Sequence, residues 1–286
     1  MVHVLGVNGV IGNSLFRNTL AQDLNWSFSK RTGTQSRSSP FKSIDITRFA
    51  EKQFLDEHDL FVIASGISPS KINKQESDSY LKSEIILLND IVSRGKRFIY
   101  FSSSRVAQYL EQGPLSIPTS MFEYVLHKAK VESIFAEYPF GSFLRLGKVV
   151  HPKLEYFLQW EKDLNLSGKI TASSGVVCEP IYQDDVANVV VNVAIEGITG
   201  ILEAWSFDSI SYFEIARLYL ANFHPNRLEK NTLIDSEVHL PGINRGPKCS
   251  RITEHLKNAQ TTGENAVILT IEEMKRQIIK RNDVYG

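Results

Sequence analysis

A glycine-rich turn near the start of the chain constrains its fold more than any other feature. Gly6, Gly9 and Gly12 join an apolar, strand-like run at residues 2–7 to a helix-like segment at residues 13–24. The first glycine permits a tight turn, the second lets a phosphate approach the backbone, and the third lets helix pack closely on strand. Backbone N–H groups at the start of such a helix face phosphates. The order therefore predicts a dinucleotide-binding turn, with cofactor contacts expected from Gly6, Asn8, Gly9, Val10, Ile11 and Gly12.

Strand-like and helix-like segments alternate along the first half of the chain, as in a doubly wound parallel sheet. The strand-like runs are residues 2–7, 25–29, 42–44, 60–64, 97–101 and 142–146. The segment 27–40 is too polar and too short for a full helix, so we expect that crossover to be a loop. The predicted fold class is α/β, a Rossmann-type doubly wound parallel sheet with a smaller, less regular C-terminal part.

The pattern loosens after residue 152, where helices are expected at 154–164, 184–196, 213–221 and 271–279, and short strands within 169–181. A polar, irregular stretch is expected from residue 222 to residue 263. We therefore assign residues 1–150 to a dinucleotide-binding domain and residues 151–286 mainly to a substrate-binding region. Part of the latter, about 181–205, is expected to return to the Rossmann core.

Tyr124 and Lys128 are four residues apart in a helix-like segment, which places both side chains on one helical face. An ammonium beside a phenol can lower the phenol's pKa and let it exchange protons near neutrality. The pair follows the strand run 97–101 and three consecutive serines, Ser102 to Ser104. A serine at that strand end could hydrogen-bond the same substrate oxygen, a pattern typical of hydride-transfer enzymes.

With these motifs in this order, the sequence resembles the extended short-chain dehydrogenase/reductase family, the nucleotide-sugar epimerases, dehydratases and reductases. The three glycines fit that family's Gly-x-x-Gly-x-x-Gly spacing. Further matching segments are Asp45-Ile46, Ala64-Ser65-Gly66, Phe101 to Ser104 with Val106, Pro118 with Tyr124 and Lys128, Leu144 to Pro152, and Gln183 to Ala187. The resemblance implies that Asp45 and Ile46 contact the adenine and that Ala64, Ser65 and Gly66 form a turn beside the cofactor.

The resemblance also implies roles in catalysis. Tyr124 would supply or remove the proton of the substrate oxygen, while Lys128 would keep the phenol acidic and contact the nicotinamide ribose. A serine hydroxyl would polarise the carbonyl. Counting back three residues from Val106 selects Ser103, whereas matching the serine run selects Ser104; we place Ser103 first.

Several positions depart from the family pattern and make the substrate pocket unusual. Lys148 stands where the family has a substrate-contacting Asn, His151 replaces a Gly, and Ala107-Gln108 replaces a Tyr-Gly pair. Dehydratases carry an Asp-Glu pair where this chain has Ser104-Arg105, which disfavours dehydration. Candidates for holding a substrate diphosphate are the cations Arg145, Lys148, Arg245 and Arg251, although Arg145 also fits a structural role at a strand end.

Cofactor choice is expected to depend on the end of the second strand, where an acid favours NAD and a basic residue favours the 2′-phosphate of NADP. The strand ends Ser29-Lys30-Arg31, and residues 25–44 contain no acid. NADP is therefore the expected cofactor, with NAD as the alternative. Because NADPH is the usual reducing carrier, a 4-keto reductase is favoured over a 4-epimerase, in polysaccharide or deoxysugar biosynthesis.

Composition agrees with an enzyme that acts on a small molecule. The formal net charge of the 286 residues is zero, which removes a general attraction to nucleic acids. No apolar run reaches the ~20 residues needed to span a bilayer, and no signal segment precedes the first strand, so we expect a cytoplasmic protein without membrane contact. Cys178 and Cys249 lack neighbours at metal-ligand spacing, so no metal is expected. Family analogy suggests a homodimer.

A second hypothesis is a protein of the same fold that binds NAD(P) without catalysis, as a regulator or scaffold. The altered positions Ala107, Lys148 and His151 favour it, and the presence of both Tyr124 and Lys128 disfavours it.

Overall fold

The computed structural model describes residues 1–31, 42–44, 55–66, 74–117, 119–206, 208–227, 232–236 and 262–285. Asp45, Ile46, Pro118, Arg245, Cys249 and Arg251 lie outside these ranges, as does the side chain of Arg31. By contacts the chain divides into two units. The first contains the described residues of 1–146 and 184–204, and the second those of 147–183, 205–246 and 258–286.

Among the described residues, the first unit is built on a seven-stranded sheet in the order β11-β6-β5-β4-β1-β2-β3, in which every pair of neighbours is parallel. Its strands are β1 (Val2–Leu5), β2 (Trp26–Arg31), β3 (Lys42–Ile44), β4 (Leu60–Ile63), β5 (Arg97–Ser103), β6 (Gly141–Leu146) and β11 (Gly200–Ala204). This confirms the predicted fold class. The chain runs outward from β1 to β3 and then returns to place β4 on the other side of β1. The strand order therefore reverses between β1 and β4, where such sheets bind ligands at the carboxyl ends of their strands.

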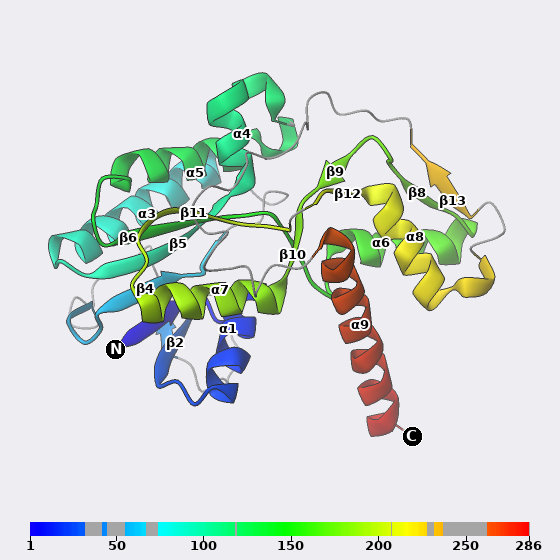
Figure 1. Cartoon of the computed structure of the whole chain (residues 1–286), viewed down its shortest axis with the longest axis horizontal. Coiled ribbons are helices and arrows are strands. Elements are labelled where there is room, and N and C mark those ends of the chain that lie inside the picture. The colour runs from blue at the N-terminus through cyan, green and yellow to red at the C-terminus, as the bar shows by residue number, and fades with distance from the viewer. Residues whose placement is uncertain are drawn as a thin grey trace. The chain divides into compact units, whose positions relative to one another are not determined.

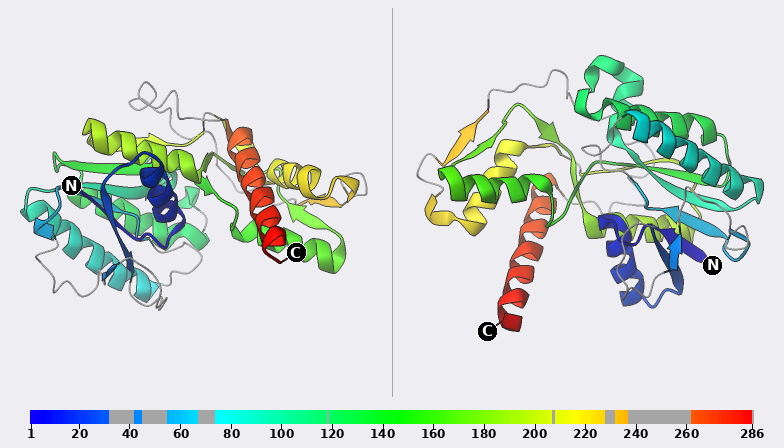
Figure 2. Two further views of the ribbon diagram at one scale, coloured as in Figure 1. Left: turned by 90° about the horizontal axis from the view of Figure 1, so that it is seen from below. Right: turned by 180° about the vertical axis from the view of Figure 1, so that it is seen from behind.

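Helices cover both faces of this sheet (Figure 1). α1 (Val10–Ala21) and α7 (Gln183–Glu196) lie on one face, and α3 (Lys74–Ser93) and α5 (Phe122–Phe135) on the other, as the further views also show (Figure 2). Buried on both sides, the central strands read as continuous apolar runs, of which Leu60–Ile63 is the clearest. The core under α3 and α5 is rich in aromatic side chains, including Phe61, Phe98 and Phe143.

Shorter helices follow β5 in the first unit. α4 (Ser104–Gln112) begins directly at the strand end, and the single turns η2 (Pro114–Ser116) and η3 (Thr119–Met121) lead to α5. On the opposite face, α7 packs on α1 through side-chain hydrogen bonds, from Ser14 to Asp184 and from Asn18 Nδ2 to Asn188 Oδ1 at 2.6 Å.

In its described residues, the second unit combines three two-stranded sheets with three helices. The sheets pair β7 (Lys148–Val150) with β10 (Pro180–Tyr182), β9 (Val177–Cys178) with β12 (Ile210–Ser211), and β8 (Ile170–Ala172) with β13 (Leu233–Asp235). The helices are α6 (Glu155–Ser167), α8 (Tyr212–Phe223) and α9 (Gly263–Tyr285), with the turn η4 (Pro225–Arg227). Phe157, Trp160 and Tyr219 pack at its centre.

The structure confirms the helices expected within 154–164, 184–196, 213–221 and 271–279, and the short strands within 169–181. α9 begins eight residues earlier than expected, at Gly263, inside the stretch taken as irregular. β13 lies in the same stretch and was not predicted, because three residues paired with a distant strand carry little local signal. No helix in the described ranges is long and apolar enough to cross a membrane.

Candidate functional site

The glycine turn connects β1 to α1 and leaves no room for a side chain at Gly6 or Gly12. Gly6 has φ +102°, a region that L-residues rarely adopt, and a Cβ there would lie 2.7 Å from the backbone nitrogen of Ser65. The N–H groups of Gly6 and Val7 both donate to the Ser29 carbonyl, at 2.9 and 3.0 Å. A Cβ at Gly12 would overlap the carbonyl oxygen of Gly6. The turn is thus clamped between the ends of β2 and β4.

The start of α1 suits an anion. Gly9 is the N-cap residue, and no side chain among the described residues caps the helix. The first backbone bond of the helix runs from the Asn13 N–H to the Gly9 carbonyl at 2.9 Å, so the N–H groups of the first turn point out of the helix end. An uncapped helix start behind a cradle that a Cβ would fill matches the pyrophosphate of a dinucleotide. Asn8, Val10 and Ile11 belong to this turn.

Two further segments border the glycine turn. Lys30, which is 9% exposed, is the next-to-last residue of β2, and Arg31 is the last residue of that strand. Ala64, Ser65 and Gly66 follow β4, and the Ser65 carbonyl accepts a hydrogen bond from Tyr80 Oη at 2.5 Å. The buried Ser65 Oγ has no partner among the described residues.

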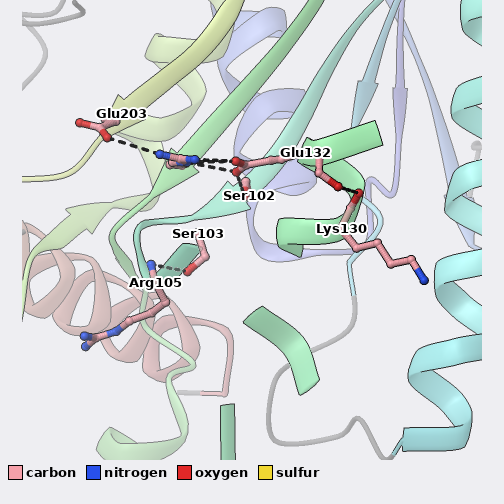
Figure 3. Close-up of polar contacts among 8 residues, drawn as sticks. Ser102, Ser103, Arg105, Lys130, Glu132 and Glu203 are labelled. Carbon is pink, nitrogen blue, oxygen red and sulfur yellow. Dashed lines mark hydrogen bonds and ion pairs between the residues drawn. The ribbon is translucent and has the colours of Figure 1, made fainter. Parts of the chain in front are cut away.

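The three serines at the end of β5 have different surroundings, and Figure 3 shows those of Ser102 and Ser103. Ser102 donates its hydroxyl proton to Glu132, which commits it to the interior. Ser103 is the N-cap of α4, where its Oγ accepts the Arg105 N–H at 3.2 Å and keeps its own proton for donation. Ser104 is the first residue of α4, half-buried, and its hydroxyl makes no hydrogen bond with a described residue. The choice between Ser103 and Ser104 stays a prediction.

Tyr124 and Lys128 lie on one face of α5, as their spacing predicts. The Lys128 ammonium is 5.9 Å from the centroid of the Tyr124 ring. The half-buried ring packs on an apolar cluster formed by Val106, Ile117 and Val125. Burial, and then the negative charge of Glu84, raise the pKa of Tyr124 to about 12. The net shift of this pKa is therefore upward, opposite to the expected direction, because burial and then an unforeseen anion both raise it.

Lys128 is held inside the protein rather than in solvent, at 5% exposure. Its Nζ donates to Tyr100 Oη at 2.8 Å, and it lies 3.9 Å from Glu84 Oε1. Tyr100 donates in turn to Glu84 Oε2 at 2.6 Å, and His127 Nε2 contacts the same oxygen at 2.7 Å. Burial lowers the pKa of Lys128, an effect that the charges of Glu84 and Glu132 oppose.

Sequence reasoning missed Glu84, Tyr100 and His127. A signal for Glu84 existed, since its spacing from Tyr80, Leu87, Leu88 and Ile91 places it on the buried face of α3. A carboxylate on an apolar helix face requires a buried partner.

The proposed substrate cations have unequal surroundings. Arg145 binds Glu132 through Nη2 at 2.7 Å and Nε at 3.2 Å, and its Nη1 lies 3.8 Å from Glu203. Figure 3 shows these polar contacts, with Glu203 at one end and Glu132 and Ser102 at the other. Two carboxylates therefore hold Arg145, which favours its structural role.

In the second unit, Lys148 Nζ lies 5.7 Å from the centroid of the Tyr156 ring. Burial and the charges of Lys148 and Lys153 lower the pKa of His151 to about 4, so this side chain is neutral at pH 7. No cluster of three or more metal-ligating side chains occurs in the described ranges, and Cys178 is a buried free thiol.

Comparison with solved structures identifies the fold. UDP-N-acetylglucosamine 4-epimerase from Bacillus cereus has a TM-score of 0.73 and 16% identity, over 96% of this chain and 99% of that chain. A dTDP-4-dehydrorhamnose reductase from Clostridium acetobutylicum has a TM-score of 0.71 and 14% identity, over 96% and 99%. UDP-glucose 4-epimerase from Thermus thermophilus, solved with NAD, has a TM-score of 0.68 and 17% identity, over 96% and 98%.

These neighbours are extended short-chain dehydrogenases/reductases, the family that the sequence motifs resemble, and the chain has their fold over nearly its whole length. No protein-family model matches the sequence, and no curated protein matches it either.

Replacing Gly12 by Ala tests the clamp at the glycine turn. The new Cβ would overlap the Gly6 carbonyl, so we expect the free energy of unfolding to fall by about 2–4 kcal/mol in urea denaturation. Gly9→Ala is the matched control, because its Cβ would have 3.4 Å to the same oxygen, and we expect a change under about 1 kcal/mol. Equal effects of the two substitutions would contradict this account of the turn.

Replacing Arg145 by Met tests its structural role. Glu132, whose side chain is 4% exposed, would keep the Ser102 hydrogen bond but lose its ion pair, and we expect stability to fall by about 3 kcal/mol. Adding Glu132→Gln to Arg145→Met should restore part of that loss, which a double-mutant cycle in urea measures. Unchanged stability together with a raised KM would instead assign Arg145 to the substrate.

Proposed function

We propose that this protein is an NAD(P)-dependent oxidoreductase that acts on a nucleotide-linked sugar by hydride transfer at a keto or hydroxyl carbon. The observation that carries the proposal is the Tyr124–Lys128 pair on α5, in a chain whose α1 starts uncapped behind a glycine cradle. The fold shared with nucleotide-sugar epimerases and reductases supports it.

The residues of the first unit have separate tasks in this reaction. The turn at Gly6, Gly9 and Gly12 would hold the pyrophosphate, with Asn8, Val10 and Ile11 beside it and Ala64 to Gly66 along the opposite side of the turn. When bound, the dinucleotide would supply or accept the hydride. Asp45 and Ile46 are proposed to contact the adenine.

Tyr124 would exchange the proton of the substrate oxygen. With a pKa of about 12 its phenol is neutral at pH 7, which is the form that donates a proton to a carbonyl being reduced. The hydroxyl of Ser103, or that of Ser104, would polarise the same carbonyl. Lys128 uses one N–H for Tyr100 and has two others for the ribose.

We favour a 4-keto reductase over a 4-epimerase, and NADP over NAD. The support is the neutral phenol and the basic pair Lys30-Arg31 at the end of β2. Lys148 and Arg245 are the proposed contacts of the substrate diphosphate. A role in polysaccharide or deoxysugar biosynthesis, a cytoplasmic location and a homodimer remain part of the proposal.

The second candidate is a protein that binds the dinucleotide without catalysis. It is favoured by the hydrogen bond that ties Lys128 to Tyr100 and by the raised pKa of the Tyr124 phenol, which burial and then the charge of Glu84 cause. Stabilisation by NADP or NAD in a thermal-shift assay, without turnover of any 4-keto nucleotide sugar, would support this candidate.

Replacing Tyr124 by Phe tests the catalytic role. We expect NADPH oxidation with the best 4-keto nucleotide sugar to fall by about 10²-fold to 10⁴-fold, because the general acid is lost. The thermal shift given by NADP should stay within error of wild type. Val125→Ala, one residue along α5 on the apolar side, is a control for packing. A Tyr124→Phe variant with near wild-type rates would overturn the assignment.

Replacing Lys30 and Arg31 together by Gln tests the cofactor preference. Loss of charged contacts to a 2′-phosphate should weaken NADP binding by about tenfold or more, while NAD binding stays unchanged. Titration calorimetry with both dinucleotides on wild type and variant measures this directly. Equal weakening of both would mean that the two side chains support the strand rather than read the phosphate.

A further inference from the structure

Glu84 is a buried anion whose Oε1 lies 3.9 Å from the ammonium of Lys128, one member of the proposed catalytic pair. It lies on α3 with no exposed surface, and its neighbours come from three elements. The titratable and charged groups around it are Tyr80 on α3, Tyr100 on β5, and Tyr124, His127, Lys128 and Glu132 on α5. A carboxylate in such a place is stable only if cations and hydrogen-bond donors compensate its charge.

A chain of hydrogen bonds compensates the charge of Glu84. Lys128 Nζ donates to Tyr100 Oη at 2.8 Å, and Tyr100 Oη donates to Glu84 Oε2 at 2.6 Å. His127 Nε2 contacts the same Oε2 at 2.7 Å, so Tyr100 and His127 share this oxygen as their hydrogen-bond partner. Oε1 has no hydrogen bond among the described residues and lies 3.9 Å from Lys128 Nζ, so it acts on the lysine as a bare charge.

This arrangement divides the charge of Lys128 between two sides. One side is the Tyr100–Glu84 pair. The ammonium lies over the Tyr100 ring, 4.2 Å from its centroid. The other side is the Tyr124 ring at 5.9 Å. The nearer partners take the stronger Coulomb interaction, and an anion behind the lysine cancels part of its effect on a phenol in front of it. Burial by itself would raise the pKa of Glu84, but Lys128, His127 and Tyr100 reverse this, so the group stays ionised.

We propose that Glu84 is a positioning residue that anchors Lys128 through Tyr100 and offsets part of the positive charge that the lysine presents to Tyr124, which suits the site to carbonyl reduction. The inference rests on the proposed function and adds to it a residue of α3 that touches neither substrate nor cofactor. A lysine without this counter-charge would favour the phenolate, the form that removes a proton from an alcohol.

The ionisation of Tyr124 tests the proposal without any turnover. NMR of the protein labelled at the tyrosine ζ carbon follows each phenol during a pH titration, and Tyr124→Phe identifies the signal. In wild type, Tyr124 should remain protonated above pH 10, the ordinary tyrosine pKa. In Glu84→Gln, which keeps the shape and the hydrogen-bond acceptor, its pKa should fall by about one unit or more. Glu84→Asp keeps the charge and should stay close to wild type.

Two results would overturn the proposal: titration of Tyr124 below about pH 9 in wild type, or an unchanged pKa in a folded Glu84→Gln variant. The first holds even if Glu84→Gln fails to fold, since it needs the wild-type protein alone.

Kinetics provide a second readout where turnover is found. The rate of reduction should begin to fall about one pH unit earlier in Glu84→Gln than in wild type, with kcat reduced about tenfold and KM for the sugar little changed. Glu84→Asp should restore most of the rate. A purely structural role would lower stability without moving the pH profile. Absence of turnover with intact NMR behaviour would overturn the proposed function and leave the ionisation of Tyr124 as inferred.

Discussion

The buried contact between Glu84 and the Lys128–Tyr100 pair is the constraint on which the arrangement of the candidate site depends. Glu84 has no exposed surface, and an anion there is tolerable only with compensating partners, which are Lys128, Tyr100 and His127. The partners come from α3, β5 and α5, so the need to pair this charge fixes the register of two helices against one strand. Tyr124 is one turn from Lys128 on α5, and its position follows from the same requirement.

A second buried carboxylate, Glu132, is paired in the same way close to the first. Tyr100 and Ser102 are two residues apart on β5 and therefore point to the same face of the sheet. Tyr100 meets Glu84, and Ser102 meets Glu132, which is four residues beyond Lys128 on α5. Arg145 on β6 completes the second pair. Tyr124, Lys128 and Glu132 thus lie on one face of α5, and the last two of them contact alternate residues of β5.

The sequence predicts the sheet and the glycine turn because their signals are local. Apolar runs flanked by helix-like segments, and glycines at spacings of three, need no knowledge of distant residues. The helix that carries Tyr124 and Lys128 was predicted on the same basis and is confirmed as α5. Arg145 was seen to have two possible roles, and its contact with Glu132, thirteen residues earlier, favours one of them.

The electrostatics of the site could not be predicted in this way, because they depend on residues far apart in the chain. Glu84 precedes His127 by 43 residues and Tyr100 by 16, and local patterns in one sequence do not reveal such contacts. Local reasoning placed a cation beside a phenol and inferred a lowered pKa. Burial of the phenol, and then the buried anion on a third element, raise the pKa instead. The sign of a pKa shift in an interior depends on every charge within a few ångströms, not on the nearest pair alone.

The second unit shows the same principle with the opposite charge. His151 has Lys148 and Lys153 as cationic neighbours, and with its burial they lower its pKa to about 4. At pH 7 this segment therefore presents the lysine charges and a neutral imidazole. The Nδ1 of this imidazole accepts a hydrogen bond from the backbone N–H of Lys153 at 3.3 Å. A neutral imidazole that accepts at Nδ1 carries its proton on Nε2. A histidine at this position consequently adds a hydrogen-bond donor to the segment rather than a further positive charge, which a count of basic residues in the sequence would miss.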